Sequence, residues 1–251
     1  MKSSVSIQGY IQREIFFCDR VYRLPRFSED KESYFSKLDE IIAKENVQAV
    51  FPSHPQEITL FDDYDHHLSI PFALPESEHF DILLDKVSTY EWLIEQGLSH
   101  YIPTYFTFKT HTELKHLIQN ELKNEKELVV KDTSGHGATG FAILTSHKNF
   151  IKAIEQQRSR VFAFDDYLES NNTHWRMVMK NLGKLEFSVD VYVHDSKTVI
   201  SVPRERTGVS NGLVLDGTVL RHNELIEISS TIAETLIDNE FLNLQFMKED
   251  G

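Results

Sequence analysis

The chain has 251 residues, 40% of them hydrophobic, so it is long enough to bury a core in one large or two small domains. Its 26 Lys and Arg residues and 39 Asp and Glu residues give a formal charge of −13, which argues against a broad surface for nucleic acid or for an anionic membrane. Because it has one cysteine and no apolar stretch long enough for a membrane span or a signal sequence, we expect a globular cytoplasmic protein, in which an anionic ligand needs a local positive site.

The first part of the chain, residues 1–75, is predicted to be a short α/β unit of strand, helix and strand. Apolar and aromatic residues at 13–22 are typical of a strand, and residues 47–51 predict a second strand that ends at a proline. Between them, Ser28 is a candidate cap for a helix whose apolar residues recur at helical spacing, namely Tyr34, Leu38, Ile41 and Ile42. A helical turn at 57–63 follows.

Two prolines and a change of pattern within residues 71–76 predict a boundary, after which residues 76–251 form a second domain. Apolar residues at helical spacing predict helices at 85–96, 112–122, 147–157, 164–169 and 223–237. The last of these helices would turn Leu225, Ile228, Ile232 and Leu236 inward. Apolar runs and alternation predict strands at 104–108, 177–180, 186–194, 198–204 and 242–247.

The centre of the chain is a glycine-rich segment between two apolar runs, residues 127–144. The runs are typical of buried strands, and between them lie Gly135, Gly137 and Gly140. Glycine permits positive φ and lets backbone amides approach phosphate oxygens. Lys131, at the mouth of the loop, would neutralise their charge. The segment therefore predicts a strand, a phosphate-binding turn and a strand.

Three other interpretations of this segment were weighed against the phosphate-binding turn. Residues 135–140 match the G-x-G-x-x-G dinucleotide fingerprint, but that motif must open a helix and residues 141–144 indicate a strand. In a protein kinase the lysine follows the glycines, and this chain contains neither HRD nor DFG. The plainest interpretation is a surface hairpin that uses glycines for its turn.

Five stretches, in this order, resemble the ATP-grasp superfamily, in particular the ATP-grasp modules of carbamoyl-phosphate-synthase-like ligases. They are Asp85-Lys86 before a helix, VVKDTSGHGATG, MVMKNLGKLEFSVDVYV, VPRER and NLQF. The resemblance runs from about Asp81 to the C-terminus. It implies an α/β and α+β fold, in which residues 1–75 form a short, partial Rossmann-like pre-ATP-grasp unit and residues 76–251 form an ATP-grasp domain of two α+β subdomains.

The resemblance implies that ATP binds between the two subdomains. Lys86 and Lys131 match the lysines that contact phosphates. The glycine loop would cover the β- and γ-phosphates with Ser134, Gly135, His136, Gly137 and Gly140. The segment that borders the adenine is matched by Met179, Lys180, Asn181 and Leu182, although many relatives have Glu-Tyr in place of Lys180-Asn181.

The resemblance also implies roles for four residues further along the chain. Glu186 matches the acid that binds the ribose hydroxyls, and Gln245 matches an oxygen ligand of Mg²⁺. Arg204 and Arg206 follow the end of a predicted strand and have the geometry to bind phosphate or carboxylate, so we place them as catalytic residues near the γ-phosphate or the acceptor.

The implied activity is that of an ATP- and Mg²⁺-dependent ligase that forms carbon–nitrogen bonds. ATP would phosphorylate a carboxylate, and an amine or similar nucleophile would displace phosphate from the acyl phosphate. The implied partners are small-molecule carboxylates and amines, with no nucleic acid and no membrane, and a homodimer is compatible with the resemblance.

Five of the candidate site residues also have a purely structural interpretation. Glu186 could face solvent from a strand, Gln245 could be a polar residue of an edge strand, and Lys86 could lie on a helix surface. The two arginines could pair with Glu205 or with another acid.

Relatives continue past the position of Gly251 into a strand whose glutamate and asparagine hold Mg²⁺. We therefore interpret the sequence as a fragment or a shortened relative that binds nucleotide but turns it over poorly. The alternative function is a non-catalytic nucleotide-binding or scaffolding protein with an incomplete metal site.

Overall fold

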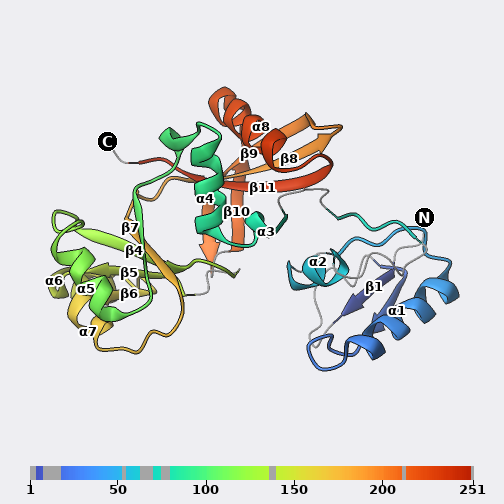
Figure 1. Cartoon of the computed structure of the whole chain (residues 1–251), viewed down its shortest axis with the longest axis horizontal. Helices are drawn as coiled ribbons and strands as arrows, with labels where there is room; N and C mark the ends of the chain where they lie inside the picture. The colour runs from blue at the N-terminus through green and yellow to red at the C-terminus, as the bar shows by residue number, and fades with distance from the viewer. Residues whose placement is uncertain are drawn as a thin grey trace. The chain divides into compact units, whose positions relative to one another are not determined.

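The computed structural model of the chain describes residues 4–7, 18–52, 55–62, 70–74, 80–135, 140–210 and 213–249. The chain forms two compact units, Met1–Leu74 and Pro75–Gly251, which we call the first and the second unit (Figure 1). None of the helices within these described ranges is long and apolar enough to cross a membrane.

The first unit contains a parallel pair of short strands and two helices: β1 (Ser4–Ile7), β2 (Arg20–Arg23), α1 (Lys31–Glu45) and α2 (Pro55–Asp62). An isolated parallel bridge joins Val50 to Phe72. The core of this unit is aliphatic and aromatic, and its buried members are Leu24, Tyr34, Phe35, Leu38, Ile41, Leu60 and Phe61. Parallel strands with helices agree with the α/β class predicted for this part of the chain.

The cap of α1 differs from the prediction. The Asp30 side chain accepts a hydrogen bond from the Ser33 backbone N–H at 3.0 Å, so Asp30 caps the helix and Ser28 does not. Both residue types can cap, and the acid that directly precedes the first helical residue takes the role because its oxygen reaches the free N–H groups of the first turn.

The strands of the first unit also differ from the prediction. The strand predicted at 47–51 is reduced to the bridge at Val50. Only the end of the strand predicted at 13–22 overlaps β2, and residues 13–17 lie outside the described residues. Strand β1, which pairs with β2, was not predicted at all.

The second unit combines helices with two sheets. Its helices are α3 (Phe80–Leu83), α4 (Lys86–Glu95), the 3-10 helix η3 (Ser99–Tyr101), α5 (His111–Gln119), α6 (His147–Glu155), α7 (Phe164–Leu168) and α8 (Asn223–Leu236). The five-stranded sheet has the order β3 (Tyr105–Phe108), β7 (Arg176–Lys180), β4 (Glu127–Asp132), β5 (Ala142–Thr145) and β6 (Val161–Ala163). The four-stranded sheet has the order β10 (Leu213–Val219), β9 (Lys197–Ser210), β8 (Glu186–His194) and β11 (Glu240–Met247).

The glycine-rich segment forms the two predicted strands, and residues 136–139 between them lie outside the described residues. Strands β4 and β5 pair antiparallel, with Leu128 opposite Leu144 and Val130 opposite Ala142. Strand β5 begins directly after Phe141, where a dinucleotide-binding fingerprint would require a helix. The strand therefore rules out the Rossmann interpretation of Gly135 to Gly140.

Strand β9 is longer than predicted. The prediction ended it at Arg204, but the strand continues to Ser210 and pairs with β8 on one side and β10 on the other. Arg204 and Arg206 therefore lie within a strand and do not follow its end. Pro203 lies within the strand, opposite Val189, and its carbonyl accepts a hydrogen bond from the Leu220 N–H at 3.1 Å.

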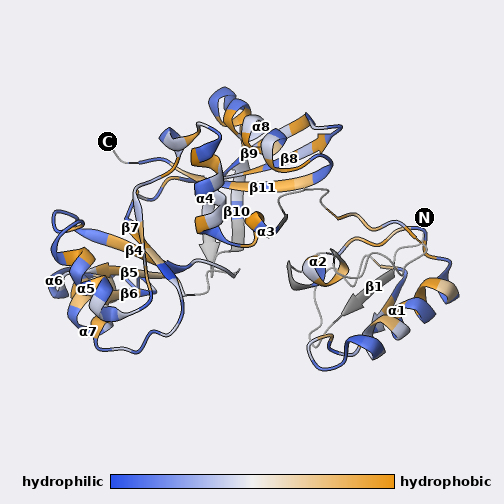
Figure 2. Cartoon of the chain, viewed as in Figure 1, coloured by the Kyte–Doolittle hydropathy of each residue, from blue (hydrophilic) through white to orange (hydrophobic). Residues whose placement is uncertain are grey.

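One face of the four-stranded sheet is covered by α8. The buried residues of β8 on this face are Phe187, Val189, Val191 and Val193, and they pack with Leu225, Ile228, Ile232 and Leu236 of α8. Figure 2 shows how apolar residues recur among hydrophilic ones along this helix. The predicted inward residues of α8 are therefore confirmed, and strand alternation leaves the other residues of β8 on the opposite face.

Helix α4 contributes to the hydrophobic clusters of both sheets. Leu93 packs into the cluster between α8 and the four-stranded sheet. Tyr90 packs against the five-stranded sheet, beside Val129, Met177 and Met179. Because α4 packs against both sheets, its first residue, Lys86, is held near the mouth of the glycine loop.

Candidate functional site

Lys131 lies at the end of a buried strand and has no counter-ion in contact. The three residues before it, Leu128, Val129 and Val130, are buried, and Lys131 itself is half-buried. No hydrogen bond or ion pair joins its ammonium group to any residue in the described part of the chain. Burial and the nearby charge of Lys86 lower the pKa of Lys131 to about 8, against the opposing charge of Glu186. Such an unpaired cation suits an anionic ligand.

Lys86 joins the first turn of α4 to the glycine loop. Asp85 caps the helix by accepting hydrogen bonds from the backbone N–H groups of the two residues after Lys86, at 2.9 and 3.0 Å. The Lys86 ammonium donates to three backbone oxygens: Asp132 O at 3.1 Å, Thr133 O at 3.4 Å and Gly135 O at 3.3 Å. Burial lowers the pKa of Lys86, and the charges of Asp85 and Asp132 oppose that shift. Two lysines therefore converge on the loop mouth.

The two ends of the glycine loop meet at the Asp132 carboxylate. Gly140 has a φ of 66°, and a Cβ atom added there would lie 2.0 Å from Asp132 Oδ1. Asp132 is held by Arg176, whose Nε lies 3.0 Å from Oδ1, and the Arg176 guanidinium also donates to the Tyr167 hydroxyl. This contact requires glycine at 140, so it explains the last glycine of the motif.

Three predicted loop residues are within the described chain and two are not. Ser134 and Gly135 are exposed, and Gly140 is half-buried. His136 and Gly137 lie outside the described residues.

The lowered pKa of Lys131 predicts how nucleotide affinity depends on pH. Only the protonated lysine attracts phosphate, and in the free protein it loses its proton near pH 8. We expect the affinity for a nucleotide triphosphate to fall about tenfold between pH 7 and 9. Isothermal titration at several pH values measures this. A flat profile would show that Lys131 does not contact the phosphates, and a Lys131→Met variant should give such a profile.

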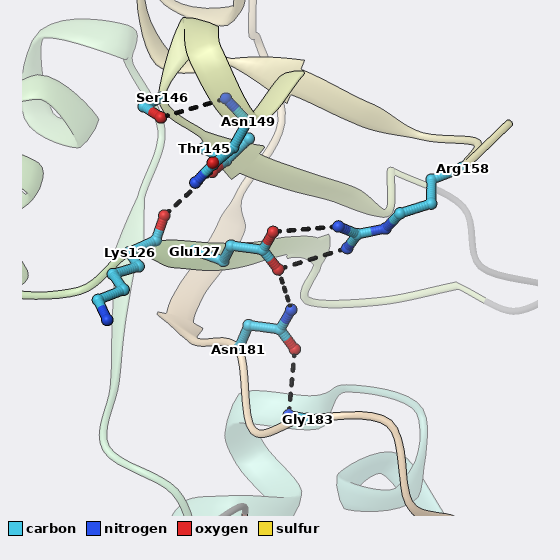
Figure 3. Close-up of polar contacts among 8 residues, drawn as sticks. All are labelled: Lys126, Glu127, Thr145, Ser146, Asn149, Arg158, Asn181 and Gly183. Carbon is cyan, nitrogen blue, oxygen red and sulfur yellow. Dashed lines mark hydrogen bonds and ion pairs between the residues drawn. The ribbon is translucent and has the colours of Figure 1, made fainter. Parts of the chain in front are cut away.

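The segment after β7 is fixed to the start of β4 (Figure 3). The Asn181 N–H donates to Glu127 O at 3.0 Å, and the Asn181 side-chain amide donates to Glu127 Oε2 at 2.8 Å. Arg158 donates to both oxygens of the same carboxylate, at 3.2 and 3.4 Å, and Gly183 N–H donates to Asn181 Oδ1 at 3.3 Å. The Asn181 side chain is therefore occupied by the scaffold, so the backbone of this segment is what remains for a ligand.

The other residues predicted to border the adenine differ in exposure. Met179 is buried beside Val129 and Met177, and Leu182 is half-buried. Lys180 is partly exposed, and its ammonium pairs with Glu249 at 2.6 Å. The buried side chain of Met179 is therefore followed, at the end of β7, by the backbone of residues 180–182.

The face of the four-stranded sheet opposite α8 carries most of the remaining predicted site residues, and we call it the outer face. Strand alternation and register assign to it Glu186, Ser188, Asp190 and Tyr192 of β8, Ile200, Val202, Arg204 and Arg206 of β9, and Phe241, Asn243, Gln245 and Met247 of β11. The structure therefore brings Glu186, Arg204, Arg206 and Gln245 onto one surface.

Both arginines of the outer face pair with acids of β8. Arg206 Nη1 lies 2.5 Å from Glu186 Oε1, and the Arg206 side chain is only 2% exposed. Arg204 Nη2 lies 2.7 Å from Asp190 Oδ2, with 35% of the Arg204 side chain exposed. The salt-bridge interpretation thus holds for both, with Glu186 and Asp190 as the partners and not Glu205. Arg204, the more exposed of the two, is the better placed for a ligand.

A protein-held metal is the least supported part of the predicted site. Gln245 is exposed and lies opposite Ser188. No group of three His, Cys, Asp or Glu side chains within the described ranges could hold a metal ion. Glu186 and Asp190, the acids of the same face, are each paired with an arginine.

Sequence reasoning missed two contributors to this arrangement. Arg176 holds the Asp132 carboxylate behind the loop, and nothing in the sequence around Arg176 signals that contact. Asn243 donates to Asp190 Oδ1 at 2.7 Å. It could have been found, because Asn243 precedes Gln245 by two residues in an alternating strand and so shares its face.

A protein-family model described as "ATP-grasp in the biosynthetic pathway with Ter operon" matches residues 173–251. This range contains the four-stranded sheet, α8 and the outer face. No curated protein matches the chain.

The chain is similar to solved structures of ATP-grasp enzymes. It resembles biotin carboxylase from Campylobacter jejuni in complex with β-γ-ATP, with 15% identity, a TM-score of 0.65 and coverage of 98% of this chain and 56% of that one. It also resembles L-amino acid ligase from Bacillus licheniformis, with 14% identity, a TM-score of 0.54 and coverage of 93% and 53%.

A third similar structure is D-alanine–D-alanine ligase from Bacillus anthracis complexed with ATP, with 15% identity, a TM-score of 0.54 and coverage of 94% and 72%. The chain spans about half the length of the first two structures. At these identities the likeness concerns the fold, and the prediction of an ATP-grasp fold is confirmed.

Proposed function

We propose, from the ATP-grasp fold of the chain, that the second unit binds ATP with Mg²⁺ and serves a ligase that joins a carboxylate to an amine. The observation that carries the proposal is Lys131, a half-buried lysine without a counter-ion in contact, beside Lys86 at the mouth of the glycine loop. An uncompensated, partly buried charge is costly in the free protein, and an anionic ligand would offset that cost. Residues 1–75 are proposed as a partial preceding domain.

The chemistry of the described residues fits the nucleotide. Lys86 and Lys131 would hold the phosphates, with the loop from Ser134 to Gly140 over them, and the segment from Met179 to Leu182 would border the adenine. Glu186 would accept hydrogen bonds from the ribose hydroxyls, and its salt bridge with Arg206 would fix the position of its carboxylate. Two acceptor oxygens on one carboxylate suit a vicinal diol.

The fit of these residues to magnesium is weaker than their fit to the nucleotide. Gln245 is a neutral ligand, and the acids near it are already paired. In this proposal Mg²⁺ would be held mainly by the phosphates, with Gln245 as one oxygen ligand.

ATP, when bound, supplies the γ-phosphoryl group that converts a carboxylate into an acyl phosphate, from which an amine displaces phosphate. The task of the chain is positioning and charge neutralisation. Lys131 and Lys86 neutralise the phosphates. Arg204, the more exposed of the two arginines of the outer face, lies in the same cross-strand row as Gln245, with Ser188 between them, and can anchor an anionic acceptor. No general base is required of the protein, since the amine only has to arrive unprotonated.

A second candidate function is nucleotide binding without turnover. It is favoured by one observation, the lack of a three-ligand metal group among the residues that the structure describes. The loop and its lysines would serve both functions equally, so nucleotide binding alone does not separate them.

The first test of the proposal is the choice of nucleotide. A ligand that binds only the folded state raises the melting temperature. We expect a non-hydrolysable ATP analogue with Mg²⁺ to raise it and NAD to leave it unchanged. Release of phosphate from ATP over a panel of carboxylates and amines then separates a ligase from a binding protein. A shift with NAD and none with the ATP analogue would contradict the proposal.

A further inference from the structure

The carboxylate of Glu127 joins the segment after β7 to the segment after α6 (Figure 3). Its two oxygens accept hydrogen bonds from the Arg158 guanidinium, at 3.2 and 3.4 Å, and Oε2 also accepts one from the Asn181 side-chain amide, at 2.8 Å. Arg158 is itself held at the end of α6, since its N–H donates to Ala153 O at 2.9 Å. The Glu127 and Arg158 side chains are 24% and 32% exposed, so most of their surface is shielded from water.

These contacts determine the orientation of the Asn181 amide. An ionised carboxylate only accepts hydrogen bonds, so the NH₂ group of Asn181 must point to Glu127. The Asn181 oxygen then points the other way, and it accepts a hydrogen bond from the Gly183 N–H at 3.3 Å. A bond from a side chain to the N–H two residues further on closes a turn, here with Leu182 at its centre. Glu127 therefore fixes the conformation of residues 181–183.

The residue at the centre of this turn has unpaired backbone groups. Leu182 is half-buried, and no hydrogen bond in the described part of the chain involves its N–H or its C=O. Unpaired backbone groups that are shielded from water are costly, and a ligand that pairs with them offsets that cost. A backbone donor beside a backbone acceptor matches the edge of a purine, which also presents a donor beside an acceptor.

The two common purines differ in the order of these groups. In adenine the 6-amino group donates and N1 accepts, whereas in guanine the 6-oxo group accepts and the N1–H donates. A backbone segment that is held in one orientation presents its own donor and acceptor in one order, so it pairs well with only one of the two bases. A segment that is free to turn would pair with both.

We propose that Glu127 and Arg158 are positioning residues that give the nucleotide site its preference for adenine over guanine. They act through Asn181, whose side chain fixes the backbone at Leu182, and not by touching the base themselves. Arg158 holds the carboxylate in place, so that the Asn181 amide has a fixed acceptor. This inference rests on the proposed nucleotide site and adds the residues that set its base selectivity.

The test compares three ligands by isothermal titration with Mg²⁺: a non-hydrolysable ATP analogue, the matching GTP analogue, and inorganic tripolyphosphate, which has no base. We expect the parent to bind the ATP analogue about tenfold or more tightly than the GTP analogue. Asn181→Leu has a similar shape and makes neither side-chain hydrogen bond, so it should weaken the ATP analogue about tenfold and remove the preference. Arg158→Met should reduce the preference. Binding of tripolyphosphate should not change, whereas a merely structural role would weaken all three ligands alike.

Exchange of the two polar groups tests whether the contact itself sets the preference. Asn181→Asp places two carboxylates against each other, so it should lose the preference as Asn181→Leu does. Adding Glu127→Gln supplies an amide that donates to the new acid, which still accepts from the Gly183 N–H, so the double variant should recover most of the preference. The matched control is Glu155→Gln, the same charge change at an exposed position of α6, and it should change none of the three affinities.

Equal binding of the ATP and GTP analogues by the parent, or a preference for the GTP analogue, overturns the inference. Binding of tripolyphosphate would then still support the proposed phosphate site. An unchanged preference in Asn181→Leu or Arg158→Met, an equal loss of all three ligands, or no recovery in the double variant also overturns it. If the parent binds none of the three ligands, the proposed function fails together with this inference.

Discussion

Replacing Lys131 with methionine should stabilise the nucleotide-free protein and weaken nucleotide binding at the same time. The pKa of Lys131 is about 8 in the folded protein, below the usual value of 10.5 for a lysine, so folding disfavours the charged form. At pH 7 the lysine is charged in both the folded and the unfolded state, and the folded state carries the full penalty. Methionine has a similar shape without the charge, and we expect the free energy of unfolding to rise by about 1 to 2 kcal/mol after allowing for solvent screening.

The sign of this effect depends on pH. Between pH 8 and 10.5 the folded protein has released the proton that the unfolded chain still holds, so the stability of the parent rises with pH and the advantage of the variant disappears. Urea unfolding at pH 7 and at pH 10.5 measures both limits.

Nucleotide affinity should move in the opposite direction. Loss of a charge-assisted contact costs about 1.5 to 3 kcal/mol, which is a ten- to hundredfold weaker affinity. Lys148→Met, at an exposed position on α6, is the control and should change neither quantity. If Lys131→Met binds the ATP analogue as tightly as the parent does, Lys131 does not contact the phosphates, and the proposed phosphate site at the glycine loop is contradicted.

Gly140→Ala should destabilise the protein more than Gly97→Ala does. Both glycines have positive φ, 66° and 80°, so both substitutions carry the strain of the left-handed region, about 1 to 2 kcal/mol. At Gly97 no atom lies within 4 Å of the added Cβ, whereas at Gly140 the added Cβ meets Asp132 Oδ1 at 2.0 Å. Asp132 cannot move freely because Arg176 holds it. We expect an extra loss of about 1 to 3 kcal/mol at Gly140, together with weaker nucleotide binding.

A double-mutant cycle isolates the contact between Gly140 and Asp132. Asp132→Ala removes the clashing oxygen but leaves Arg176 without its acid, so it is destabilising by itself. The combination of Asp132→Ala with Gly140→Ala should be less destabilised than the sum of the two single variants. Additive losses would mean that the loop ends do not meet at Asp132.

Local patterns in the sequence predicted most of the fold of the second unit. The inward face of α8 and the two strands that flank the glycine loop depend on residues close in sequence, and these are found. Strand β10 was missed because its Asp216 and Gly217 weaken the strand pattern, and β6 was missed because it has only three residues. Such short or broken strands are fixed by their neighbours in the sheet.

The candidate site was harder to predict, because its partners are distant in the chain. Glu186 and Arg206 are paired across two strands, and Asp132 meets both Arg176 and Gly140. Alternation along a strand predicts on which face of the sheet a side chain lies, but it does not predict with which acid an arginine forms a salt bridge. The ligand roles of Lys86, Glu186 and Gln245 stay predictions that binding measurements must decide.

The tie between Asn181 and Glu127 has a mechanical consequence for the second unit. Residues 181–185 are the link from β7 to β8, and the first of them is bound to the five-stranded sheet through both its backbone and its side chain. Gly183, with a φ of 120°, has no side chain, so it is the residue of this link that can change φ and ψ with the least strain once its N–H leaves Asn181 Oδ1, to which it donates at 3.3 Å. A rotation of the four-stranded sheet would therefore pivot near Gly183, as hinges use a few residues to absorb the change in φ and ψ. It would swing Glu186 toward or away from Lys131 while Met179 stays in place, so the distance between Glu186 and Lys131 would change without moving the start of the link at Asn181.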